Sequence, residues 1–202
     1  MLYNKSGSTR DHVTVSFTVQ ANGGVVAVRV VNRGKRNVAL NHLKDLETTG
    51  KSGAWKFGVT DNGYVTRIEF LNILQDLDEY LTKHDIVRPV VLFLDGYKGH
   101  YGLDVIEFCE LKQIQLWLLR ANMTHLLQPL HLTLFKSVKS HFARLAHCWQ
   151  GEHPGDTLGK YTAVKIFRAA TEEALKSLSI IINDLRELDS FHGTYLLLIL
   201  GN

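Results

Sequence analysis

Residues 88–100 read RPVVLFLDGYKGH, and this stretch decides the fold class. Within it, a continuous apolar run ends on Asp95 and Gly96. An apolar run without alternation is typical of a strand buried on both faces, as in a parallel or mixed sheet. Downstream, the apolar spacing predicts a helix over 103–112 and a second strand over 114–119. Strand, helix and strand in this order predict an α/β protein with a right-handed crossover.

Two further strands are expected upstream. Residues 12–20 alternate between apolar and polar side chains, which is the pattern of a half-buried strand. A turn signal, Asn-Gly-Gly at 22–24, separates them from a β-branched run at 25–31, so the pair predicts a hairpin. Residues 32–55 show no sustained period, and we expect a loop there.

Helices are expected on both sides of the central unit. Apolar residues recur at steps of three and four from Thr66 to about residue 84. Thr66 is a suitable N-cap, and Glu69 stands three residues later as a capping-box partner. Similar spacing predicts helices over 131–149 and 162–178.

Composition and charge narrow the function classes. The chain has 202 residues, 45% of them apolar and 21% charged, with a formal net charge of +3. These values predict a globular domain whose mildly basic surface is compatible with a polyanion. The two cysteines, Cys109 and Cys148, belong to no disulfide or zinc pattern. No signal peptide or apolar run long enough to span a membrane is found, so we expect a soluble intracellular protein.

Asp95 is the sharpest local candidate for chemistry. In open α/β sheets, functional groups gather beyond the carboxyl ends of the strands. A carboxylate at that place suits Mg²⁺, which prefers oxygen ligands. An aspartate before glycine also caps turns without any further role. From the residues alone, both interpretations stay open.

A second candidate is the segment at 124–131, which reads THLLQPLH. A polar cluster between a strand and a long helix often lines a site, although histidines there are more often structural than ligating. The histidines of the chain match no zinc spacing. The chain also contains no phosphate-binding glycine loop and no nucleophile elbow.

These two segments resemble known sequence blocks. Residues 88–100 resemble the block around the second catalytic aspartate of DDE-type transposases of the Tigger/pogo group, which includes centromere-protein-B-like and jerky-like proteins. Residues 124–130 are similar to the block that leads into the third aspartate. The resemblance covers residues 5–150, and 151–202 is expected to be a divergent helical extension. Beside Asp95, the motif residues are Gly96, His100, Thr124, His125, Gln128 and Pro129.

The resemblance implies a ribonuclease-H-like mixed sheet flanked by helices. It also implies three aspartates that hold two Mg²⁺ ions, or Mn²⁺, for phosphodiester transfer. Asp95 takes the second position, and His131 stands at the third. The first aspartate belongs to a central strand expected before Val13, which the 202 residues lack. Because imidazole is a poor ligand for Mg²⁺, we expect no strand cleavage.

The sequence therefore predicts a transposase-derived domain that is catalytically inactive and binds DNA without specificity, in the nucleus. The cations expected to contact DNA are Lys98, Lys136, Lys139 and Arg144. Two alternatives stay open. In the first, the retained transposase fold serves as a scaffold for a protein partner. In the second, a longer form supplies the missing strand and is an active Mg²⁺-dependent strand transferase.

Overall fold

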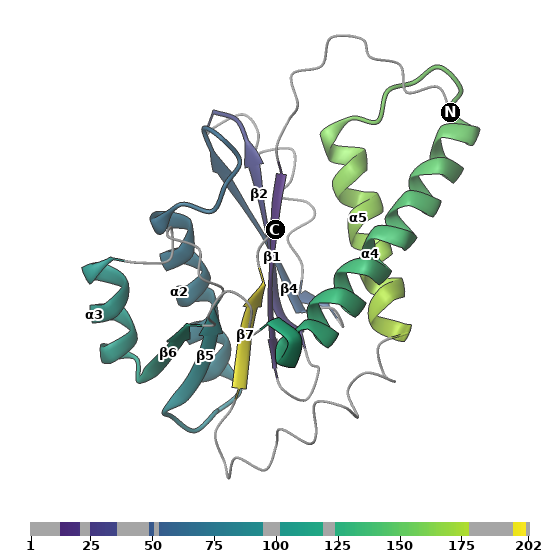
Figure 1. The fold of residues 1–202 in the computed structure, drawn as a ribbon. Coiled ribbons are helices and arrows are strands. Elements are labelled where there is room, and N and C mark those ends of the chain that lie inside the picture. The colour runs from purple at the N-terminus through teal and green to yellow at the C-terminus, as the bar shows by residue number, and fades with distance from the viewer. Residues whose placement is uncertain are drawn as a thin grey trace.

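A computed structural model describes most of the chain. The described residues are 13–20, 25–35, 49–50, 53–94, 102–118, 124–177 and 196–200, with backbone alone at 49, 50, 53, 124–134, 160, 177 and 196–200. These segments form a seven-stranded sheet with helices on both faces (Figure 1). The predicted α/β class is confirmed.

The sheet is mixed, and its order is β3-β4-β2-β1-β7-β5-β6. Its strands are β1 (Val13–Gln20), β2 (Val25–Arg33), β3 (Thr49–Gly50), β4 (Gly53–Thr60), β5 (Val90–Leu94), β6 (Ile114–Leu118) and β7 (Leu196–Leu200). β1 runs antiparallel to both of its neighbours, β2 and β7. The pairs β2–β4, β5–β7 and β5–β6 are parallel. Five strands therefore share one direction.

The predicted hairpin is confirmed, while the predicted loop over 32–55 is wrong at both ends, since β2 runs to Arg33 and β3 and β4 lie within the second half of that range. β1 and β2 pair as expected, with Phe17 opposite Val28. β4 then begins at Gly53 and pairs in parallel with β2. Trp55 and Phe57 alternate along β4 and are buried. The surrounding glycines and lysines hid this period in the sequence.

One helical layer covers one face of the sheet. It consists of α2 (Arg67–Lys83) and α3 (Leu103–Leu111), close to the expected ranges. Thr66 caps α2, since its hydroxyl accepts a hydrogen bond from the Glu69 N–H at 3.3 Å. The Glu69 carboxylate, however, pairs with Arg29 of β2 at 3.0 Å, so its main partner lies in the sheet.

The opposite face carries α4 (Thr124–Glu152) and α5 (Lys160–Ser177). Their aromatic side chains pack on β1 and β4, with Phe135 against Phe17 and Phe167 against Trp55. We expected α4 to begin after Pro129, because proline lacks a helical N–H donor. The helix instead begins at Thr124, so the 124–131 segment is its first two turns rather than a loop.

β7 lies at the centre of the sheet, in the place of the central strand that the resemblance puts before Val13. It pairs antiparallel with β1, Val19 opposite Leu198, and parallel with β5, Phe93 opposite Leu198. The expected helical C-terminal part therefore contains a strand as well, and the sheet has no gap at its centre. A short apolar run can fill such a place when it comes from a distant part of the chain, a relationship that local periodicity does not reveal. Residues 178–195, part of the helical extension expected over 151–202, lie outside the described residues.

Candidate site at the carboxyl edge of the sheet

The carboxyl ends of β2, β4, β5, β6 and β7 lie at the same end of the sheet, because these strands are mutually parallel. We call this end the carboxyl edge, as distinct from the lateral edge strands. Asp95 follows Leu94, the last residue of β5, in the sequence. Asp95, Gly96, Lys98 and His100 themselves lie outside the described residues. The structure thus gives the place where β5 ends.

The register of three strands fixes the row of residues next to this end. Leu94 of β5 stands opposite Ile199 of β7. One residue further, Leu200 stands opposite Phe17 of β1. Neighbouring strands are separated by about 4.8 Å, so β1 and β5 lie about 10 Å apart across β7. Phe17 therefore marks, on β1, the level at which β5 ends.

α4 contacts β1 at this level through Phe135. The Phe135 ring meets the Phe17 ring edge-on, with centroids 5.4 Å apart and planes at 87°. His131 is four residues earlier in α4, which is about one helical turn. The backbone of His131 therefore lies in the part of α4 that precedes the contact with β1. The side chains of His131, Thr124, His125, Gln128 and Pro129 lie outside the described set.

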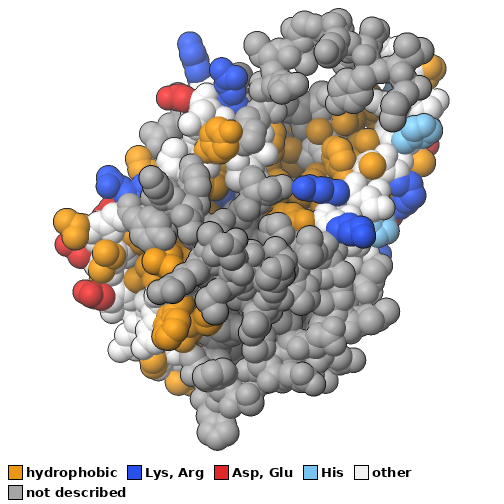
Figure 2. Space-filling model, viewed as in Figure 1, with side chains coloured by type: hydrophobic (Ala, Val, Ile, Leu, Met, Phe, Trp, Pro, Cys, Tyr) orange, Lys and Arg blue, Asp and Glu red, His pale blue; other side chains and the backbone are white. Residues whose placement is uncertain are grey.

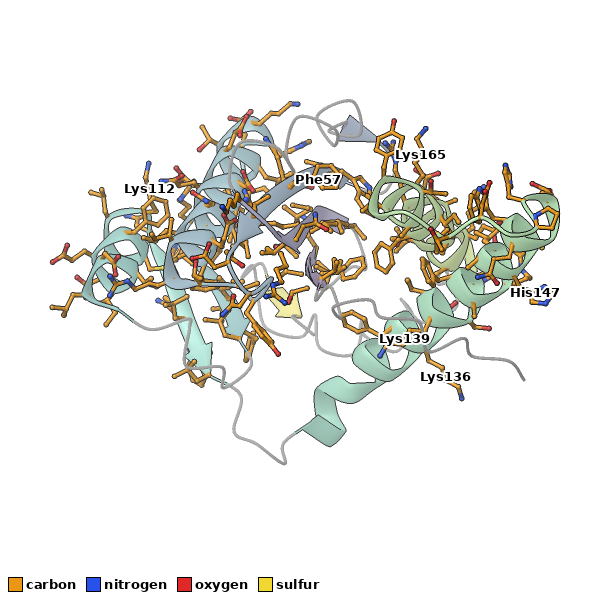
Figure 3. The ribbon with its side chains drawn as sticks, turned by 90° about the horizontal axis from the view of Figure 1, so that it is seen from above. Phe57, Lys112, Lys136, Lys139, His147 and Lys165 are labelled. Carbon is orange, nitrogen blue, oxygen red and sulfur yellow. The ribbon has the colours of Figure 1, made fainter. Side chains whose placement is uncertain are left out.

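The predicted DNA-binding cations on α4 differ in their surroundings. Lys136 and Lys139 are exposed, and Figure 3 shows them on the side of α4 that is turned away from α5. Neither has an ion-pair partner among the described residues. Arg144 instead pairs with Glu173 of α5, which also lies 3.0 Å from Nδ1 of His141. The Arg144 hydrogen bond lowers the pKa of Glu173.

A second ionic cluster joins α2 to the opposite end of the sheet, where β5 and β6 begin. Asp78 of α2 accepts hydrogen bonds from Arg88 at 2.6 Å and from Lys112 at 2.8 Å. Arg88 also donates to the Lys112 carbonyl at 2.5 Å. Burial raises the pKa of Asp78, but the hydrogen bonds from Lys112 and Arg88 outweigh it, so the pKa is lowered. This cluster fixes the entrance to β5 and the turn before β6.

A third ionic cluster lies between β2 and α2. Arg29 of β2 is buried and donates to Glu69 at 3.0 Å and to Asp76 at 2.5 Å. Lys56 of β4 approaches the same Asp76 at 4.0 Å. Because both carboxylates come from α2, these pairs hold that helix against the sheet. We assign this cluster a structural role.

No group of three or more histidine, cysteine, aspartate or glutamate side chains is close enough to hold a metal ion within the described part of the chain. Asp95 and the His131 side chain are not in that part. Whether Asp95 and His131 suit the metal that the resemblance implies therefore depends on the ligand atoms that these residue types offer.

These observations define the class of the protein. It is an α/β protein with helices on both faces of a mixed sheet and five strands that end at one carboxyl edge. Residues 10–183 match the family described as DDE superfamily endonuclease. The chain belongs to this family.

One curated relative supplies a further comparison. It is the "MFS-type transporter clz9" of Cochliobolus lunatus, 24% identical over 171 residues. The match covers 85% of this chain but 18% of the relative, so the chain spans less than a fifth of that protein. No solved structure matches. Among the described helices of this chain, none is long and apolar enough to cross a membrane.

Proposed function

We propose that this chain is a transposase-derived DDE domain of the Tigger/pogo type that binds DNA without sequence specificity and does not cleave it. Family membership supports the origin in a metal-dependent nuclease. The single observation that carries the loss of cleavage is His131, an imidazole at the position where the family motif places an aspartate.

The sheet order supports a ribonuclease-H-like arrangement. The resemblance implies a central strand that lies between the strand at Val13 and the strand that ends on the second aspartate. β7 stands in this relationship to β1 and β5. Asp95 follows β5, and α4 follows β6 by a short connection. These relations agree with the resemblance without depending on the side chains of the motif.

The donor set does not fit the metal chemistry of the family. Asp95 offers one carboxylate, and His131 offers nitrogen. Mg²⁺ prefers oxygen donors, and it binds a site through its carboxylates and substrate phosphates. A carboxylate and an imidazole lack the clustered negative charge that attracts two divalent ions. We therefore derive no cleavage step for this chain.

Lys136 and Lys139 are the cations that we assign to DNA. Both are exposed on α4 and have no ion-pair partner in the described part of the chain. They follow His131 on the same helix, so a backbone bound at the carboxyl edge of the sheet would continue along them. Lys98 is retained from the sequence motif. Arg144 is withdrawn, since it is engaged by Glu173.

The test uses the purified 202-residue chain. Nicking of supercoiled plasmid is measured with Mg²⁺ and with Mn²⁺, the more permissive metal. Binding to a labelled duplex is measured by fluorescence anisotropy across a salt series. We expect binding that weakens steeply with salt and no nicking with either metal. Metal-dependent nicking by the pure chain would overturn the loss of activity, and a flat salt response would overturn the DNA surface.

Nuclear localisation belongs to the same proposal, because DNA is the expected ligand. The alternative of an active strand transferase in a longer form predicts that the added segment, and not this chain alone, confers nicking. The same plasmid assay on both forms separates the two.

A further inference from the structure

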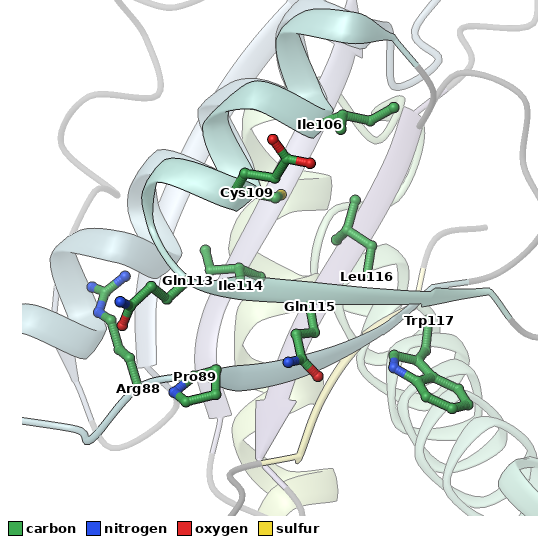
Figure 4. A pocket seen from close by; sticks show the side chains of 10 residues that line it. Arg88, Pro89, Ile106, Cys109, Gln113, Ile114, Gln115, Leu116 and Trp117 are labelled. Carbon is green, nitrogen blue, oxygen red and sulfur yellow. The ribbon is translucent and has the colours of Figure 1, made fainter.

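β6 forms one edge of the sheet as far as the strands are described. An edge strand presents N–H and C=O groups that have no partner on one side, so it can accept another strand. An open groove of about 740 Å³ follows this edge. Ile106 and Leu116 line it on the α3 side of β6, while Gln115 and Trp117 line it on the other side (Figure 4). The groove thus wraps both faces of the free edge.

Exposed apolar side chains gather around this groove. Nine large hydrophobic side chains are exposed among the described residues, and six of them lie on α3, on β6 or just before β5. These six are Val87, Leu103, Ile106, Leu111, Trp117 and Leu118. Figure 2 shows apolar side chains on the left side of the molecule, where α3 and β6 lie, and a second group on its right side. Two of the six, Ile106 and Trp117, line the groove itself. Large exposed apolar surface marks an interaction site more often than an ordinary solvated surface.

The charged side chains of α3 all have one sign, while Arg88 also lines the groove. α3 carries Asp104, Glu107 and Glu110 and contains no lysine or arginine. Asp104 pairs with Arg67 at 3.3 Å, whereas Glu107 and Glu110 have no ion-pair partner among the described residues. The neighbouring cations, Arg88 and Lys112, are already held by Asp78. The charge left for a partner to neutralise is therefore negative.

We propose that this groove binds an extended peptide segment of a partner protein, which adds a strand to the free edge of β6. The backbone of the peptide pairs with β6, and its side chains alternate between the two faces. Side chains toward α3 are basic and meet Glu110 and Glu107. Side chains on the other face are apolar and cover Trp117. This surface is separate from the proposed DNA surface on α4 and requires neither DNA nor metal.

Charge argues for a foreign peptide over a second copy of this chain. Two β6 strands paired about a two-fold axis would place both α3 helices on the same face of a continuous sheet. Each helix carries three carboxylates and no cation. Like charges brought close together oppose that pairing, whereas a lysine or arginine in the added strand favours it.

The experiment uses the full chain and two labelled eight-residue peptides, one of alternating valine and lysine and one of alternating valine and glutamate. Anisotropy measures binding, and hydrogen exchange measures protection of residues 114–118. We expect saturable binding of the lysine peptide with new protection at 114–118, and binding at least about ten-fold weaker for the glutamate peptide. Both Glu110→Lys and Trp117→Ala should weaken lysine-peptide binding by about ten-fold.

Ile68→Ala is the matched control, since Ile68 is exposed on α2, away from the groove. It should bind the lysine peptide like the wild type. Circular dichroism establishes that each variant is folded. Three outcomes overturn the proposal: peptide binding without protection at 114–118, dimerisation that Trp117→Ala abolishes, or protection of the same strand by a thymidine oligonucleotide. None of them bears on the lysines of α4, so this proposal and the proposed function fail independently.

Discussion

Gly58 and Glu69 are in such close contact that a methyl group added to Gly58 would lie 2.5 Å from Oε2 of Glu69. Gly58 lies in β4, and Glu69 lies in the first turn of α2. Glu69 in turn accepts a hydrogen bond from the buried Arg29. The missing side chain at Gly58 thus leaves the space in which a buried ion pair forms.

Gly58→Ala is therefore expected to destabilise the protein. The methyl group displaces the Glu69 carboxylate and leaves Arg29 with an incomplete set of partners. Loss of a buried pair and overpacking together predict a fall of about 2–4 kcal/mol in the free energy of unfolding. Urea denaturation followed by circular dichroism measures it. Gly151→Ala, in a position with no atom within 4 Å, should be neutral or slightly stabilising.

Acid stability should depend on Asp78. Its pKa is lower in the folded protein than the ordinary value of 3.8, so its contribution is present above that value and is lost as pH falls through the folded pKa. Asp78→Asn should reduce the free energy of unfolding by about 1–3 kcal/mol at pH 7 and flatten its pH dependence below pH 4. Thermal melts between pH 2.5 and pH 7 test this. Asp85→Asn, at an exposed residue, should melt like the wild type.

The two thiols should react at very different rates. Burial raises the pKa of Cys109 to about 12, whereas Cys148 is exposed on α4. Because the thiolate is the reactive form, a disulfide reagent at pH 8 should modify one thiol quickly and the second only on unfolding. Cys148→Ser should remove the fast phase. Two fast thiols in the native protein would contradict the packing of α3 on the sheet.

Removal of the exposed lysines should change the salt dependence of DNA binding. In Lys136→Ala/Lys139→Ala, the slope of log K against log salt should become shallower by about 2, because each phosphate contact contributes about 0.9. Arg144→Ala should leave the slope unchanged. An unchanged slope in the lysine double variant would remove both residues from the DNA surface.

Restoring a carboxylate at the third motif position should not restore cleavage. His131→Asp provides an oxygen donor at the third motif position, which with Asp95 makes two of the three carboxylates that the resemblance implies. We expect no plasmid nicking with Mg²⁺ or Mn²⁺. His147→Asp, at an exposed position of the same helix, is the control for added negative charge. Nicking by His131→Asp alone would show that the site needs only two carboxylates.

Local patterns predicted the elements whose partners lie nearby in the chain. The alternation of 12–20 and the capped helix at Thr66 were recognised because their periods are complete within a few residues. β4 was missed, since its signal depends on a parallel strand more than 20 residues away. β7 was missed for the same reason, as its apolar residues alone do not indicate which strands they join.

The candidate site was predicted in part. The sequence placed Asp95 directly after a buried strand and His131 in a helix, and β5 and α4 contain those segments, while the site itself stays a prediction. It treated Arg144 as a free cation, because the pairing with Glu173 joins two helices and cannot be read from either one. The exposed Trp117 was also missed, since an apolar strand does not reveal that one of its edges is open.

The position of β7 has a consequence for the order in which the molecule is built. Every other described strand leaves the ribosome before the one that occupies the centre of the sheet. Until then, β1 and β5 each present an edge without a neighbour, and the nascent chain holds two separate half-sheets. Closure requires contacts between residues about 180 positions apart, so it is slow and occurs late. During this interval the two half-sheets expose unpaired strand edges, and the chain depends on protection from aggregation until β7 has been synthesised.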